Sequence, residues 1–234
     1  MSCKIDRRVT YYLMIDTETA NTQRIDGRLF MKDAQCYDIG FAIIDRHGRV
    51  YVRVSVVVTE IFDGMADLMQ SAYYAHKLPQ YYVELENGER QRMTLYKVRK
   101  MICELMELYN VRAVVAHNAR FDWNALNATQ RYVTKSKYRY FFPYGTEIWD
   151  TMKMAQDVFT QRPTYIRFCE KHGYMTKHQT PRPRVTAEVL YRYLTNNPDF
   201  VEAHTGAEDV DIEAQIFAAC MGAHKKMRRK LWED

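Results

Sequence analysis

The sequence lacks paired cysteines and long apolar runs. Its five cysteines are scattered, odd in number and include no C-x-x-C pair: Cys3, Cys36, Cys103, Cys169 and Cys220. A disulfide framework and a cysteine zinc site are therefore both disfavoured. No window of about 18 apolar residues occurs, so we expect no transmembrane helix and no membrane partner. The opening residues MSCKIDRRVT carry no apolar core of a secretion signal, and we expect a cytoplasmic protein with reduced, buried thiols.

The sequence also has no internal repeat and no Pro-, Gly- or Ser-rich linker between domains. Hydrophobic residues make up 47% of the chain and charged residues 27%, which is close to globular averages and disfavours disorder. We expect one domain over residues 1–222, followed by a basic tail over 223–234. The formal net charge of +5 permits a polyanionic partner without requiring one.

Apolar and β-branched runs predict the order of strands and helices. Three early strands are expected over 9–16, 36–45 and 50–58, and the short turn between the last two implies an antiparallel hairpin. The following segment has one short helical candidate near 62–69. Later elements are expected as a helix over 94–109, a strand over 112–116, a helix over 121–132, a strand over 147–150, and helices near 165–171, 186–194 and 208–221. The pattern favours an α/β fold with a mixed five-stranded sheet, its first three strands antiparallel, flanked by helices.

Acidic residues at the ends of apolar segments carry the first functional signal. Asp16 and Glu18 end the first strand, and residues two apart on a strand point to the same side. Two carboxylates forced together repel unless a cation offsets their charge, and carboxylate oxygens suit Mg²⁺ or Mn²⁺. The alternative is an ordinary surface D-x-E at a strand end.

Two later segments carry further acids and a histidine. Asn118 and Asp122 follow the strand over 112–116; alternatively, Asn118 caps a helix and Asp122 supports its first turn. His204 precedes Asp209 at the start of a late helix. A helix that begins near residue 206 would leave His204 on a hinged loop, which suits a general base; the alternative is a loop histidine without a role.

In chain order, the sequence reads D-x-E, then N-x-x-x-D within HNARFD, then H-x-x-x-x-D. This combination resembles the DEDDh family of 3′–5′ exonucleases, which has the ribonuclease H-like fold. Thr205, rather than a tyrosine, lies four residues before Asp209, so the resemblance is to the histidine subclass. The residues that carry it are Asp16, Glu18, Asp122, His204 and Asp209.

The resemblance implies a metal-dependent enzyme that hydrolyses single-stranded DNA from its 3′ end to nucleoside 5′-monophosphates. Two Mg²⁺ or Mn²⁺ ions are implied, with Asp16 bridging them, Glu18 and Asp209 holding the ion that activates water, and Asp122 supporting the other. His204 is the implied general base. The implied substrate-binding residues are Thr17, Thr19, Asn118 and Phe121.

Other features bear on the substrate. Ala20 and Asn21 stand where family members often carry Thr-Gly, and we expect this difference to affect substrate preference more than metal chemistry. The segment 131–144 interleaves cations with aromatic residues, a combination used to bind single strands of nucleic acid. Alternatively, its aromatic residues only pack against the protein and its cations are solvated. An exoribonuclease or oligoribonuclease of the same fold, and a non-enzymatic nucleic-acid-binding or polymerase-associated subunit, stay as alternative functions.

Overall fold

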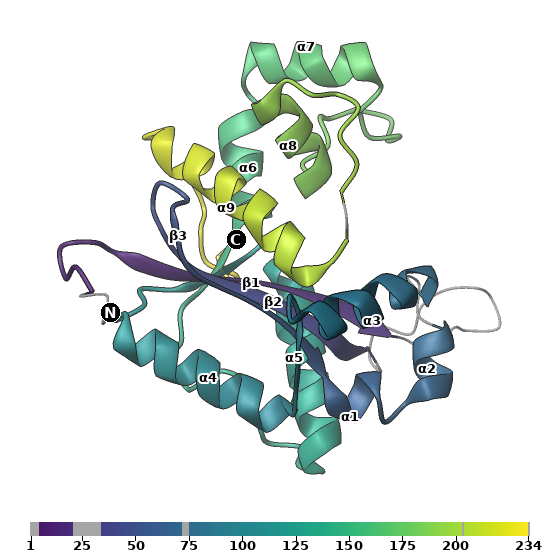
Figure 1. Ribbon diagram of the computed structural model, residues 1–234. Helices are drawn as coiled ribbons and strands as arrows, with labels where there is room; N and C mark the ends of the chain where they lie inside the picture. Colours follow the sequence, from purple (N-terminus) through teal and green to yellow (C-terminus); the bar gives the residue numbers. More distant parts are fainter. Residues whose placement is uncertain (1–4, 21–33, 72–74, 203, 234) are drawn as a thin grey trace.

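The computed structural model describes residues 5–20, 34–71, 75–202 and 204–233. Its centre is a six-stranded mixed sheet in the order β4-β3-β2-β1-β5-β6 (Figure 1). The pairs β1–β2 and β2–β3 are antiparallel, whereas the pairs β3–β4, β1–β5 and β5–β6 are parallel. The strands are β1 (Tyr11–Ala20), β2 (Gln35–Asp45), β3 (Val50–Val58), β4 (Gln91–Met93), β5 (Val114–Ala116) and β6 (Ile148–Asp150).

The predicted fold class and the antiparallel start of the sheet are confirmed, but the predicted count of five strands is wrong. The additional strand is β4, which pairs in parallel with Val56–Val58 at the end of β3. Its sequence, Gln-Arg-Met, is short and mostly polar. An apolar run is the signal that predicts a buried strand, so this edge strand gave no such signal.

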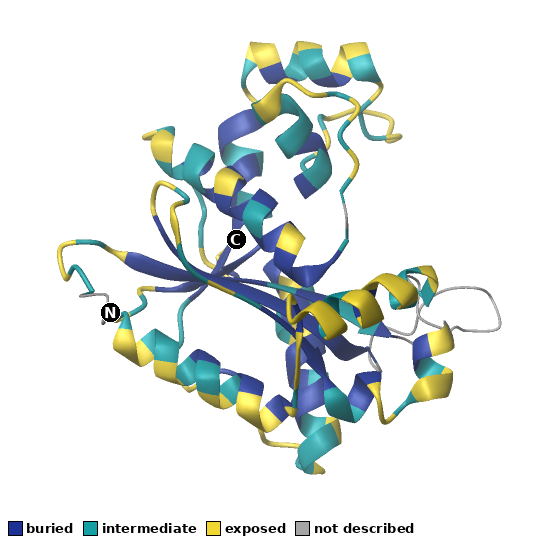
Figure 2. Cartoon of the chain, in the orientation of Figure 1, coloured by how far each residue is buried: buried dark blue, intermediate teal, exposed yellow. Residues whose placement is uncertain are grey.

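Helices cover both faces of the sheet (Figure 1). The first face packs against α1 (Thr59–Phe62), α2 (Ala66–Ser71), α3 (Leu78–Asn87), α4 (Leu95–Leu108) and α5 (Ala119–Thr134), with a 3₁₀ turn at Ala75–Lys77. The second face packs against α6 (Thr151–Phe159), α7 (Pro163–His172), α8 (Ala187–Thr195) and α9 (Gly206–Gly222). Because both faces are covered, every residue of β2 is buried, as the dark blue centre of Figure 2 shows.

Side-chain caps fix where two of the helices begin. The Thr94 hydroxyl accepts a hydrogen bond from the Lys97 amide at the start of α4, and the Asp150 carboxylate accepts one from the Met152 amide at the start of α6. Threonine and aspartate are both common helix-capping residues. The candidate near 62–69 is divided between α1 and α2, and α3 was not predicted.

The chain after α9 returns to the edge of the sheet. Trp149 of β6 bridges Lys230, the Asp150 amide donates to the Arg229 carbonyl at 2.7 Å, and Leu231 is buried. The basic segment therefore lies along β6, although the division at residue 222 stays a prediction. No helix in the described ranges is long and apolar enough to cross a membrane. The described cysteines are all free, and Cys3 lies outside the described residues.

Candidate active site

The carboxyl-terminal half of β1 presents its two acids to the side on which α9 packs. Asp16 lies opposite Gly40 and Glu18 lies opposite Asp38 in the antiparallel register with β2. Thr17, between the two acids, is buried and points to the other side, because side chains alternate along a strand. The predicted shared orientation of Asp16 and Glu18 follows from this alternation.

Two glycines bring the start of α9 directly onto the sheet. A Cβ atom at Gly40 would lie 1.9 Å from the carbonyl carbon of Gly206, and one at Gly206 would lie 2.5 Å from the amide nitrogen of Gly40. Only glycine leaves room for this backbone contact. Since Asp209 is in the first turn of α9, the contact sets the position of Asp209 relative to β1.

A buried ion pair anchors the same helix end. The Asp38 carboxylate accepts hydrogen bonds from the Gly206 amide at 3.0 Å and from the Tyr81 hydroxyl at 2.6 Å. The Arg90 guanidinium forms an ion pair with the same carboxylate, and both side chains are buried. Sequence reasoning did not identify Asp38; its only local signal is an acid inside an otherwise apolar strand.

Glu18, His204 and Asp209 form a cluster of ligand atoms that could hold a metal ion. One ligand atom from each lies within 4.8 Å of the other two. Burial, with repulsion from neighbouring acids, raises the pKa of Glu18 to about 9 and that of Asp209 to about 8. The Asp209 Oδ1 atom is buried and has no hydrogen-bond partner among the described residues, and such an atom suits a cation.

The other two predicted acids adjoin this cluster. Burial raises the pKa of Asp16, and the charges of Glu213, Asp122, Asp209 and Glu18 raise it further. Asp122, in the first turn of α5, approaches from the opposite face, where its Oδ1 accepts a hydrogen bond from the Thr17 hydroxyl at 2.8 Å. Burial raises the pKa of Asp122 to about 7. The structure thus brings all four predicted acids to one end of the sheet, and their individual roles stay predictions.

Glu213 is a further acid that sequence reasoning missed. It lies one turn after Asp209 on α9, is buried, and accepts a hydrogen bond from the His117 amide at 3.2 Å. Among the neighbouring charges, that of Glu213 has the largest effect on the pKa of Asp16. Its four-residue spacing from Asp209 places both on one helix face. Because the residues around Glu213 form an apolar stripe, the sequence did not single it out as a site residue.

His204 lies outside the helix, as predicted, because α9 begins at Gly206. The backbone of His204 is left-handed, with a φ of 52°, and its carbonyl accepts a hydrogen bond from the Lys77 ammonium at 3.4 Å. Its Nδ1 atom lies 3.8 Å from the Glu202 carboxylate. Burial and the charge of Lys77 lower the pKa of His204, which keeps the ring neutral near pH 7.

The predicted substrate-binding residues differ in what they contact. Thr17 directs its hydroxyl to Asp122, so its side chain positions that carboxylate. Asn118 is exposed, and its side chain makes no capping hydrogen bond to α5, contrary to the capping interpretation. Thr19, on β1, and Phe121, in the first turn of α5, are half-buried. Substrate contacts by all four stay predictions, and Asn21 lies outside the described residues.

The donor set fits a hard divalent cation. Carboxylate oxygens dominate it, one of them buried without a partner in the described ranges, and a histidine lies within reach. Mg²⁺ and Mn²⁺ prefer such oxygen ligands. The positive charge of a bound cation would also offset the repulsion between the acids and lower the pKa of each.

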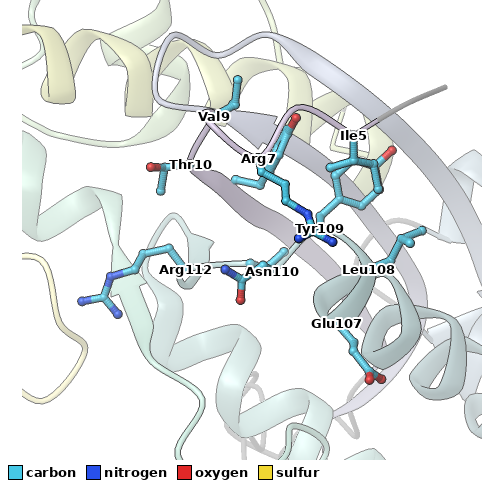
Figure 3. A pocket seen from close by; sticks show the side chains of 11 residues that line it. Ile5, Arg7, Val9, Thr10, Glu107, Leu108, Tyr109, Asn110 and Arg112 are labelled. Atoms are coloured by element: carbon cyan, nitrogen blue, oxygen red, sulfur yellow. The ribbon is translucent and has the colours of Figure 1, made fainter.

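A separate hollow lies at the opposite end of β1. Figure 3 shows it between the residues that lead into β1 and the end of α4, with Arg7, Tyr109 and Asn110 around it. Five residues of strand, or about 16 Å, separate Tyr11 on its wall from Asp16. The hollow therefore does not belong to the acidic site.

Comparison with solved structures identifies the architecture. The nuclease domain of 3′hExo, a DEDDh family member bound to rAMP, superposes with a TM-score of 0.62 and 13% identity over 97% of this chain and 100% of that domain. The chain has the DEDDh exonuclease fold. A 3′-exonuclease that recognises the histone mRNA stem-loop gives a TM-score of 0.62 at 12% identity, over 94% of this chain and 85% of that one.

A third structure with this fold is Escherichia coli exonuclease I with single-stranded DNA and a zinc ion. It gives a TM-score of 0.51 at 14% identity, over 91% of this chain and 40% of that one. No family model and no curated protein matches the sequence. The likeness therefore concerns the fold alone.

Proposed function

We propose that the protein is a metal-dependent 3′–5′ exonuclease that hydrolyses single-stranded DNA to nucleoside 5′-monophosphates. The observation that carries the proposal is the cluster of Glu18, His204 and Asp209, whose ligand atoms lie within 4.8 Å of one another in a DEDDh fold. Asp16 and Asp122 adjoin this cluster from β1 and α5.

Two divalent ions, when bound, would stabilise the attacking and leaving oxygens of the phosphodiester. Asp16, Glu18, Asp122 and Asp209 are the residues that would hold them. Thr17 orients Asp122 through its hydroxyl, and the contact of Gly206 with β2 holds Asp209 in place. These supports matter because a displacement of about 1 Å at a catalytic group costs on the order of 10²-fold in rate.

His204 is the proposed general base. Its lowered pKa leaves the ring neutral, as a base requires. We assign the ring proton to Nδ1, which lies 3.8 Å from the Glu202 carboxylate, so that Nε2 would accept the proton from the attacking water. His117 is unsuited to the role because both of its ring nitrogens make hydrogen bonds, to Thr151 and Val185.

Single strands of DNA and RNA, labelled at either end, test the proposal when incubated with Mg²⁺, Mn²⁺ or EDTA. We expect metal-dependent shortening from the 3′ end and release of 5′-monophosphates. Asp209→Asn should abolish cleavage and keep the fold, and Asp199→Asn, an exposed acid in the segment between α8 and α9, is the matched control. Cleavage that survives EDTA, or that persists in Asp209→Asn, would overturn the proposal.

RNA is the second candidate substrate. Two of the structures with this fold are described with RNA or rAMP, whereas exonuclease I is described with single-stranded DNA. The paired DNA and RNA substrates separate the candidates directly. Binding without hydrolysis of either would instead support a non-enzymatic nucleic-acid-binding role.

A further inference from the structure

An aromatic strip runs along the outer side of α5. We use this name for Trp123 on α5, Tyr140 in the following loop and Trp232 near the carboxyl terminus. The ring of Trp123 lies 6.0 Å from that of Tyr140 and 6.3 Å from that of Trp232. The buried ring of Phe142 stacks on Trp123 at 6.3 Å and supports it from below. Three chain segments therefore build one continuous aromatic surface.

The outer members of this strip are more exposed than packing requires. Trp232 is 63% exposed and Tyr140 is 53% exposed. Leu231, which is buried, already anchors the end of the chain against the sheet, so Trp232 is not needed for that purpose. Large exposed aromatic side chains that lie together indicate an interaction surface.

Two arginines flank the strip. The Arg120 guanidinium lies 5.4 Å from the Trp232 ring, and the Arg131 guanidinium lies 5.1 Å from the Tyr140 ring. Within the described part of the chain, no acidic side chain lies at ion-pair distance from either arginine. The strip therefore combines flat apolar rings with positive charge, which is complementary to a single strand of nucleic acid.

The strip starts in the same turns of α5 as Asp122, on another face of the helix, and it is held firmly. Arg120 and Trp123 share the first turns of α5 with Asp122, and residues 120, 123, 127 and 131 fall on one helix face by their spacing. The buried Asn127 side chain accepts a hydrogen bond from the Phe141 amide at 2.8 Å, which fixes the loop that carries Tyr140. The surface thus leads away from the acids along α5.

We propose that the aromatic strip binds the nucleotides that precede the 3′ end of a single strand while that end lies among the acids. Bases would stack on the three rings, and phosphates would contact Arg120 and Arg131. The proposal rests on the proposed exonuclease function. It assigns the strip to strand affinity, and it gives the strip no part in bond cleavage.

Trp232→Ala and the Trp232→Ala/Tyr140→Ala double variant test it in the full chain. Binding of a fluorescent 12-nucleotide DNA or RNA in EDTA should weaken by about 5- to 150-fold for each ring removed, which is the usual contribution of one stacked base. In Mg²⁺, KM for the 12-mer should rise while kcat and the cleavage of a dinucleotide stay unchanged. Trp232→Phe should restore most of the affinity.

Tyr96→Ala is the matched control, because Tyr96 is 73% exposed but lies on α4. Thermal unfolding shows whether each variant keeps its fold. If the double variant binds the 12-mer as tightly as the unaltered protein, and the unaltered protein cleaves it, then the strip does not bind the strand, and the exonuclease proposal is unaffected. An unaltered protein that binds the 12-mer through the strip but cleaves nothing would overturn the exonuclease proposal instead.

Discussion

Gly40→Ala tests whether the backbone contact between β2 and α9 assembles the site. The added Cβ atom would lie 1.9 Å from the Gly206 carbonyl carbon, 2.0 Å from its oxygen and 2.3 Å from the Ala207 nitrogen. All three atoms are backbone, so no side chain can rotate away. The start of α9 must therefore move by about 1 Å before the contact reaches 3.0 Å.

This movement has two expected consequences. Overpacking a core costs about 1–3 kcal/mol of stability, and we expect the upper end because backbone lies on both sides of the contact. The hydrogen bond from the Gly206 amide to Asp38 is stretched as well. A shift of Asp209 by about 1 Å should lower kcat on the order of 10²-fold.

Urea unfolding and single-turnover cleavage measure the two effects. Gly222→Ala, at the other end of α9, is the control, because its Cβ atom would meet nothing within 4 Å; alanine there should be neutral or stabilise by up to about 1 kcal/mol. If Gly40→Ala unfolds like the unaltered protein and cleaves at the same rate, then the close contact does not position Asp209.

Three further predictions concern the charges around the site. Asp38→Ala should lower the free energy of unfolding by about 1–3 kcal/mol, because it leaves the buried Tyr81 hydroxyl and Gly206 amide without their acceptor and leaves Arg90 paired with Glu84 alone. Asp6→Ala, which breaks an exposed pair, is the control, and a urea midpoint that moves equally in both would contradict this account. In EDTA, the thermal midpoint should fall as pH rises from about 5 to 9. In the folded protein the pKa values of Glu18, Asp122 and Asp209 are about 9, 7 and 8, above their usual values near 4. The folded chain therefore holds protons that the unfolded chain has released, and it loses stability as the pH rises. Mn²⁺ should restore the midpoint most at the alkaline end, and a midpoint that rises with pH in EDTA would refute the crowding of these acids. His204→Ala should lower kcat about 10²–10⁴-fold with little change in 12-mer binding, and unchanged turnover would assign the base to another group.

Local patterns in the sequence predicted where several of these residues lie. Asp16 and Glu18 share a side because strands alternate, and His204 lies outside α9 because the helix begins at Gly206. Asp150 caps α6 through a bond to an amide two residues away. Each of these features involves residues close together in the chain, so a short window of sequence can indicate it.

The features that sequence reasoning missed depend on contacts between distant residues. Arg90 reaches Asp38 across 52 positions of the chain, and Gly206 meets Asp38 across 168. β4 forms beside β3 although its own residues are polar. Asn118 precedes α5 as a capping residue would, but its side chain makes no capping hydrogen bond. Its backbone N–H instead donates to the Asp150 carboxylate at the end of β6, at 3.1 Å. In each case the tertiary partner, rather than local preference, decides the structure.

The crowding of acids has opposite effects on the stability of the fold and on its affinity for cations. Burial and mutual repulsion raise the pKa of Glu18 and Asp209, so near pH 7 both carry protons that a cation must displace. Cation binding should therefore release protons, and the affinity should rise with pH until Glu18 is ionised near pH 9. Over the same range the protein without a cation loses stability. Asp38 and Gly40 lie on β2, the next strand, and their contacts with Arg90 and Gly206 hold the start of α9 against the sheet despite that repulsion.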